Sequence, residues 1–198
     1  GWASGNKYSL LGSARTAAQL VSYEVSLGLS VIGVIMLSQS LSLVEIVDAQ
    51  RETVWDVLLQ PLGFLGFVIA MVAEVNRVPF DLPETESELV SGYHTEYTGM
   101  KFAFFFLGEY ADMFVVSAIG VTVFLGGWYT GIPALDGVLH PALVFIGKSV
   151  LLVLVQIWLR WTLPRLRVDQ LMFICWKIFI PATLGLVFLY GLWRVVTA

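Results

Sequence analysis

The chain has 198 residues, of which 58% are hydrophobic and 13% are charged, and its mean hydropathy is +0.81. Because soluble domains carry about 25% charged residues, this composition excludes an ordinary soluble domain and indicates a membrane protein. The formal net charge of -4 does not favour nucleic acid as a partner. The single cysteine, Cys175, excludes a disulfide framework and any Fe–S cluster held by this chain alone, since such a cluster needs about four ligands.

Five apolar segments predict transmembrane helices, because about 20 apolar residues span the hydrocarbon core of a bilayer. In chain order they cover residues 17–44, 57–73, 102–124, 142–161 and 171–195. A charged segment over residues 45–56 is expected to be a loop between the first two spans. The sequence therefore predicts an all-α integral membrane protein with one transmembrane helical domain over residues 1–198. An odd number of spans places its two ends on opposite sides of the membrane.

The distribution of lysine and arginine predicts the orientation of the chain. If the Gly1 end is cytoplasmic, that side collects Lys7, Arg15, Arg77, Lys101, Arg160, Arg165 and Arg167. Only Arg51 and Arg194 lie on the other side. We therefore expect the long acidic loop between the second and third helices to face the cytoplasm. Lys148 and Lys177 fall within spans, where snorkelling or pairing between helices is a simpler explanation than a part in proton transfer.

Several carboxylates fall inside or at the ends of the expected spans. They are Glu24, Glu74, Glu109 and Asp112. An ionised Asp at the centre of a transmembrane helix costs about 2.5 to 3.5 kcal/mol on insertion scales, and such residues usually mark ion or proton pathways. We expect these four acids to form a hydrated proton relay. The alternative is that each is an interfacial residue, or is paired with a nearby base such as Arg77 or Lys101 and only holds helices together.

The stretch from Ala73 to Asp112 holds eight of the 15 acidic residues, between long apolar runs. Its middle, residues 76–97, contains two prolines that end the helix, followed by closely spaced glutamates and by amphipathic aromatic rings. One interpretation is a solvated acidic turn with tyrosines at the headgroup level. The other is a polar mouth at the end of a span, suited to a polar headgroup whose apolar tail stays in lipid.

The run AEVNRVPFDLPETESELVSGYHTEYTGMKF, followed by GEY, closely resembles the quinone-site membrane subunit of respiratory complex I. This protein is called the H subunit in bacteria and has the number 1 among the mitochondrially encoded chains. GWASGNKYSLLG at the start, SYE at residues 22–24 and LPRLRVDQLM at residues 163–172 support the resemblance, which covers essentially the whole chain. Family members have about three further spans before the equivalent of Gly1, so the chain looks like the C-terminal part of a longer protein.

The resemblance implies a function. NADH, FMN and Fe–S clusters would belong to peripheral partner subunits, quinone would be the substrate, and antiporter-like membrane subunits would be further partners. The residues that would line the quinone chamber and its exit are Arg77, Asp81, Glu84, Glu86, Glu88 and Glu96. The family pattern places Glu24, Glu74 and Glu109 at the start of an acidic path that links quinone chemistry to proton pumping. This chain alone would hold no cofactor, no metal and no complete active site.

Other functions share some of these features. A homologous membrane subunit of a membrane-bound hydrogenase or of another donor-linked dehydrogenase differs mainly in its peripheral partners. An ion channel or secondary transporter also uses intramembrane acids but has no need of the polar mouth, and a purely structural anchor is a further alternative. The expected location is the bacterial plasma membrane, as a multi-pass protein, with the mitochondrial inner membrane as the alternative.

Overall fold

The computed structural model describes residues 1–82, 92–132, 136 and 138–197. Its α-helices are α1 (Lys7–Ser38), α2 (Leu43–Glu52), α3 (Asp56–Leu59), α4 (Pro61–Glu74), α6 (Met100–Phe124), α8 (Pro141–Thr162), α9 (Val168–Ile174) and α10 (Ile180–Thr197). Short 3-10 turns η1 (Trp2–Ser4) and η2 (Gly92–His94) and a π-helical segment η3 (Cys175–Phe179) complete it. No strand occurs within the described ranges, and the predicted all-α class is confirmed.

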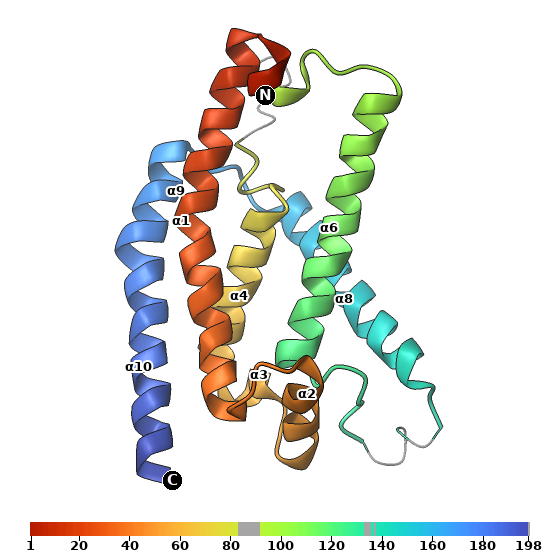
Figure 1. Cartoon of the computed structure of the whole chain (residues 1–198), viewed down its shortest axis with the longest axis vertical. Coiled ribbons are helices and arrows are strands. Elements are labelled where there is room, and N and C mark those ends of the chain that lie inside the picture. Colours follow the sequence, from red (N-terminus) through yellow and green to blue (C-terminus); the bar gives the residue numbers. More distant parts are fainter. Residues whose placement is uncertain (83–91, 133–135, 137, 198) are drawn as a thin grey trace.

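Four helices are long and apolar enough to cross a membrane: α1, α6, α8 and the continuous helix from α9 to α10. The predicted second span is shorter than the others, because α4 has 14 residues and therefore rises about 21 Å, less than the roughly 30 Å of a hydrocarbon core. In Figure 1 α4 lies between α1 and α6, and most of its second half is buried. It is therefore an inner helix with little surface for lipid.

The prediction that residues 45–56 form a loop was wrong, because α2 and the start of α3 occupy this segment. In α2 the buried residues are Ile46, Val47 and Gln50, at positions i, i+1 and i+4, so an apolar stripe faces the bundle while the charges face outward. The high charge content of the segment conceals this stripe when composition alone is considered.

Polar contacts fasten the bundle at this end, opposite Gly1. The Gln50 amide donates to the carbonyls of Thr122 and Val123 (3.2 and 2.9 Å) and accepts from Gly126 N (2.9 Å). Lys148 Nζ donates to Leu125 O at 2.5 Å, and also to the carbonyls of Gly127 and Tyr129. Lys148 thus binds backbone carbonyls at and beyond the C-terminal end of α6, groups that the helix leaves without partners. This contact is the pairing between helices considered from the sequence.

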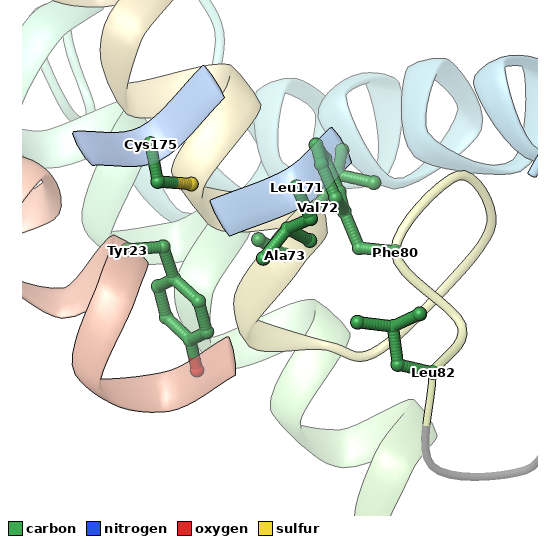
Figure 2. Close-up of a cluster of buried hydrophobic side chains, with 7 residues drawn as sticks. All are labelled: Tyr23, Val72, Ala73, Phe80, Leu82, Leu171 and Cys175. Atoms are coloured by element: carbon green, nitrogen blue, oxygen red, sulfur yellow. The ribbon is translucent and has the colours of Figure 1, made fainter. Parts of the chain in front are cut away.

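A buried apolar cluster at the Gly1 end of the bundle fixes the chain that follows α4 (Figure 2). It consists of Tyr23, Val72, Ala73, Phe80, Leu82, Leu171 and Cys175, drawn from α1, α4, the following segment and the last helix. Leu82 is 1% exposed. The backbone N–H of Leu166 donates to Pro79 O at 3.0 Å, which ties the same segment to the connection before α9. Residues 77–82 are therefore held as part of the core.

The last helix changes its hydrogen-bond pattern at η3, where Ile180 N donates to Cys175 O across five residues. Pro181 follows directly and explains the change: it has no N–H to donate, and in a regular helix its ring would press on the carbonyl four residues earlier. A single wider turn relieves that clash without ending the helix.

Candidate functional site

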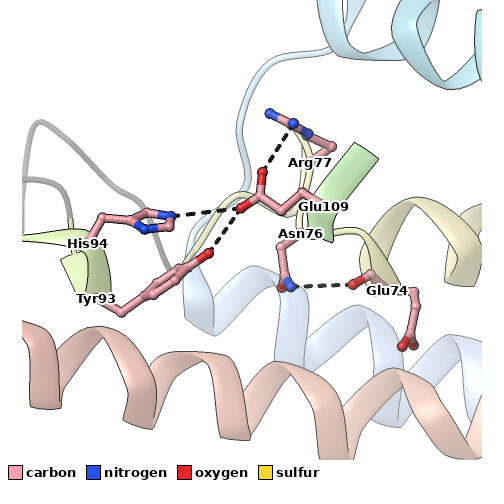
Figure 3. A network of polar contacts seen from close by, with 6 residues as sticks. All are labelled: Glu74, Asn76, Arg77, Tyr93, His94 and Glu109. Carbon is pink, nitrogen blue, oxygen red and sulfur yellow. Dashed lines mark hydrogen bonds and ion pairs between the residues drawn. The ribbon is translucent and has the colours of Figure 1, made fainter. Parts of the chain in front are cut away.

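Helix α4 ends in a sharp turn at Asn76, whose φ of +52° lies in the left-handed region. Asn adopts this region more readily than other side chains and can end a helix there. Gln19 Nε2, on α1, donates to Asn76 Oδ1 at 3.0 Å and to Ala73 O at 2.8 Å. Figure 3 shows that the turn sends the Glu74 side chain towards α1 and the Arg77 side chain the other way, towards α6.

Glu109 is the centre of a cluster made by three separate parts of the chain, which we call the Glu109 cluster. Arg77 Nη2 lies 3.1 Å from Glu109 Oε2, the Tyr93 hydroxyl donates to Oε1 at 3.0 Å, and His94 Nε2 lies 3.8 Å from Oε1. Arg77 and His94 are each 5% exposed. The Arg77 guanidinium carbon also lies 5.0 Å from the centre of the Tyr110 ring. The carboxylate therefore joins α6 to the turn after α4 and to η2 (Figure 3).

A second group of acids surrounds Tyr23 and is called the acid cluster below. The Tyr23 side chain is hydrogen-bonded to Glu74, and the charges of Glu24, Glu74 and Asp112 all act on it. The charges of Asp112 and Glu24 also act on Glu74. Three helices, α1, α4 and α6, supply these groups. Because Asp112 follows Glu109 by three residues, the two clusters lie about one helix turn apart along α6.

A basic recess of about 450 Å³ adjoins the segment after α4. Its lining includes Arg15 from the first part of α1, Leu82, and Arg165, Arg167 and Asp169 from the connection to α9 and its first turn. Guanidinium groups are rigid donors of several hydrogen bonds and suit carbonyl or anionic oxygens. Among the described residues, no group of three or more His, Cys, Asp or Glu side chains could hold a metal ion.

Residues 1–191 match the family model described as NADH dehydrogenase. The chain belongs to the NADH dehydrogenase family. It is 55% identical over 185 residues to the H subunit of NADH-quinone oxidoreductase from Dehalococcoides mccartyi (strain CBDB1), covering 93% of this chain and 50% of that protein. It is 53% identical over 185 residues to the H subunit from Brevibacillus brevis, covering 93% and 54%, and 53% identical over 191 residues to the H subunit from Anoxybacillus flavithermus, covering 96% and 56%. The chain therefore spans about half the length of the curated relatives it matches.

Among the expected relay residues of this NADH dehydrogenase family chain, Glu24, Glu74 and Asp112 come together around Tyr23. Glu109 instead forms the ion pair with Arg77, which was one of the pairings considered from the sequence. It stays connected to the others through its position on α6.

The expected chamber residues are more scattered. Arg77 is buried against Glu109, and Asp81 lies partly buried between two core residues, Phe80 and Leu82. Glu96 is exposed and accepts a hydrogen bond from Asn6 Nδ2 at 2.7 Å, so it ties the loop to the start of α1. Glu84, Glu86 and Glu88 lie outside the described residues.

Sequence reasoning missed the parts played by Gln19, Tyr23 and His94 in this NADH dehydrogenase family chain. Gln19 and Tyr23 are spaced i, i+4 and therefore share a face of α1, which is the available signal. What they touch on α4 depends on helix packing. The sequence predicts His94 to be one of several interfacial rings, whereas it is buried among the rings of Phe102, Phe105 and Phe106.

Proposed function

We propose that this chain is part of the membrane subunit of a proton-translocating NADH:quinone oxidoreductase, where it lines the quinone chamber and begins the acidic path to the proton pumps. Its family and the names of its relatives support the enzyme. The observation that carries the proposed role is the position of Glu109. This carboxylate binds Arg77 of the mouth segment on one side and stands one turn from Asp112 of the acid cluster on the other.

Quinone is the substrate in this proposal, and its reduction to quinol consumes two electrons and two protons. The electrons come from NADH through FMN and Fe–S clusters of peripheral partner subunits, and antiporter-like membrane subunits receive the effect of the acidic path. The chain lies in the bacterial plasma membrane, in agreement with the bacterial origin of its relatives. The chamber residues are Arg77 and Asp81, and the loop acids Glu84, Glu86, Glu88 and Glu96 line its exit.

The coupling step follows from the charges of the Glu109 cluster. Arg77 donates to a carbonyl oxygen of the headgroup as negative charge gathers there, and its hold on Glu109 weakens. Glu109 then takes up a proton, supplied through the Tyr93 hydroxyl or His94. At an effective dielectric of about 20, neutralising a charge about 5 Å away changes the energy of a neighbouring carboxylate by about 3 kcal/mol. Asp112, and through it Glu74 and Glu24, therefore respond to the redox state of the headgroup.

The test replaces Glu74 by Gln in the assembled complex, reconstituted in vesicles, with Glu52→Gln as the control because Glu52 is an exposed acid of α2. We expect Glu74→Gln to lower proton translocation by about tenfold or more, since a positioned proton-transfer group contributes at least about a hundredfold. NADH oxidation by an artificial acceptor should be retained, which shows correct assembly. Unchanged quinone reduction and unchanged translocation in the assembled variant would refute the proposed relay.

A further inference from the structure

A line of buried polar groups continues beyond the acid cluster along α1. Ser22, Ser26 and Ser30 recur every four residues on its buried face and are at most 4% exposed. Serines in membrane helices commonly bind their own backbone, and Ser22 and Ser30 do so, through Ala18 O and Leu27 O. Ser26 differs: its Oγ is buried and has no hydrogen-bond partner within the described part of the chain. A buried hydroxyl without a partner costs about 1–3 kcal/mol, so its site calls for a ligand.

Gln60 presents a second such atom, at the break between α3 and α4. The residue is 0% exposed, and its Nε2 donates to Gly33 O of α1 at 2.8 Å. Among the residues that the structure describes, its Oε1 has no partner. A cavity of about 10 Å³ lies here, lined by Gln60, Ser30, Gly33, Gly63, Thr183 and Tyr190 among others. That volume is about the space that one water molecule requires.

The glycines beside Gln60 keep this oxygen accessible. A Cβ on Gly33 would stand 2.6 Å from Gln60 Oε1, and a Cβ on Gly63 would stand 3.2 Å from it. Both distances are shorter than side chains tolerate, so only glycine lets the amide lie flat between α1 and α4 with Oε1 next to the cavity.

The spacing of these groups suits bridging by water. Ser26 follows Tyr23 by three residues and Ser30 follows Ser26 by four, which is a rise of about 4.5 and 6 Å. Each gap is about twice a hydrogen-bond length of roughly 2.8 Å, so one water fits between successive groups. Gln60 N donates to Asp56 O at 2.7 Å, so the line ends at Asp56, one turn before Gln60, at the end of the bundle opposite Gly1.

We propose that Ser26, Ser30, Gln60 and Asp56, the polar line, bind a file of water molecules that carries protons between the acid cluster and the opposite side of the membrane. The inference rests on the proposed function, because the acid cluster supplies or receives the protons. A proton that enters the file at Glu74 releases another at Asp56. The serines and Gln60 only orient the water and keep their own protons.

The end groups fit this role. Burial raises the pKa of Asp56 to about 7, so this carboxyl exchanges protons near neutral pH. The competing explanation is a dry polar seam that holds α1 against α4 and α10. A dry seam predicts no water beside Gln60 Oε1 and no effect of its polarity on proton movement.

The test replaces Gln60 by Leu, which fills similar space without a polar group, in the assembled complex. The matched control is Gln156→Leu, because Gln156 is also a buried glutamine with one bond between helices, to Ser117 Oγ at 2.8 Å, but lies off the line. We expect Gln60→Leu to lose proton translocation while quinone reduction continues, and Gln156→Leu to keep both. A high-resolution map of the unaltered complex should contain water beside Gln60 Oε1 and Ser26 Oγ.

Should Gln60→Leu fail to assemble, Ser26→Ala tests the same line without a change of packing. Its control is Ser149→Ala, since Ser149 is equally buried but bonds Phe145 O of its own helix. If Glu74→Gln impairs translocation while Gln60→Leu and Ser26→Ala do not, and no water is found, the polar line is refuted and the proposed function stands. If Glu74→Gln also has no effect, the proposed function fails as well.

Discussion

Glu109→Gln should loosen the attachment of η2 and of the segment after α4 to α6. Arg77 Nη2 and Glu109 Oε2 are 3.1 Å apart, with side-chain exposures of 6% and 17%. At an effective dielectric of about 20 their attraction is about 5 kcal/mol. Removing one partner of a buried ion pair costs about 3–5 kcal/mol, because the other charge stays buried without compensation. We take the lower end, about 3 kcal/mol, since Glu109 retains some contact with solvent.

Hydrogen–deuterium exchange in the assembled complex measures this cost directly. The amide of Phe80 is bonded to Arg77 O at 2.8 Å and that of Tyr97 to His94 O at 2.9 Å, so both report local opening. A loss of about 3 kcal/mol accelerates their exchange by about 100-fold. Tyr93→Phe removes only one hydrogen bond to a charged group, worth about 1.5 kcal/mol, and should accelerate it by about tenfold.

The double variant decides whether the ion pair is the cause. Removing both charges, in Arg77→Gln with Glu109→Gln, leaves no uncompensated charge and should exchange more slowly than Glu109→Gln alone. If the double variant exchanges as fast as the single variant or faster, the ion pair contributes nothing and the reasoning is refuted.

Two further predictions concern the opposite end of the bundle. Lys148→Met leaves three carbonyls without their donor, so the complex should inactivate thermally at a lower temperature; an unchanged inactivation temperature would show that the contact is unimportant. For Asp56, the folded-state pKa of about 7 exceeds the usual value of 3.8, so the folded chain binds more protons than the unfolded chain between these pH values. Its contribution to stability is therefore full below about pH 4 and declines as the pH rises towards 7, and Asp56→Asn should flatten this part of the profile of thermal stability against pH. An identical slope in the variant would contradict the assignment.

The sequence predicted the parts of the fold that depend on local apolar content. The long runs around residues 17–38 and 142–161 became helices because little else can cross a bilayer. It failed at α2, where charge content and burial belong to opposite faces of one helix. The meeting of Glu24, Glu74 and Asp112 was expected from their chemistry, whereas their arrangement around Tyr23 depends on how α1, α4 and α6 pack, which no local pattern encodes.

The assignment of Glu109 shows the same limit. An intramembrane acid and a nearby base allowed both a relay and a simple ion pair, and only the turn at Asn76 brings Arg77 to Glu109. The family, by contrast, was recognisable from the residues themselves, because long motifs such as LPRLRVDQLM are far more specific than any single spacing of charges.

The wide turn at η3 also sets the phase of the last helix. Leu171 and Cys175 before it pack in the same core cluster as Val72 of α4, and Phe179 and Thr183 after it lie against Gly66 of α4. In a regular helix, positions four apart advance about 40° per step and would wind off the partner within these 12 residues. The π turn takes up that excess, so one side of the helix stays on α4 throughout. The last helix thus has a splice in its periodicity, with one residue more than a regular helix would need to present the same two contact faces.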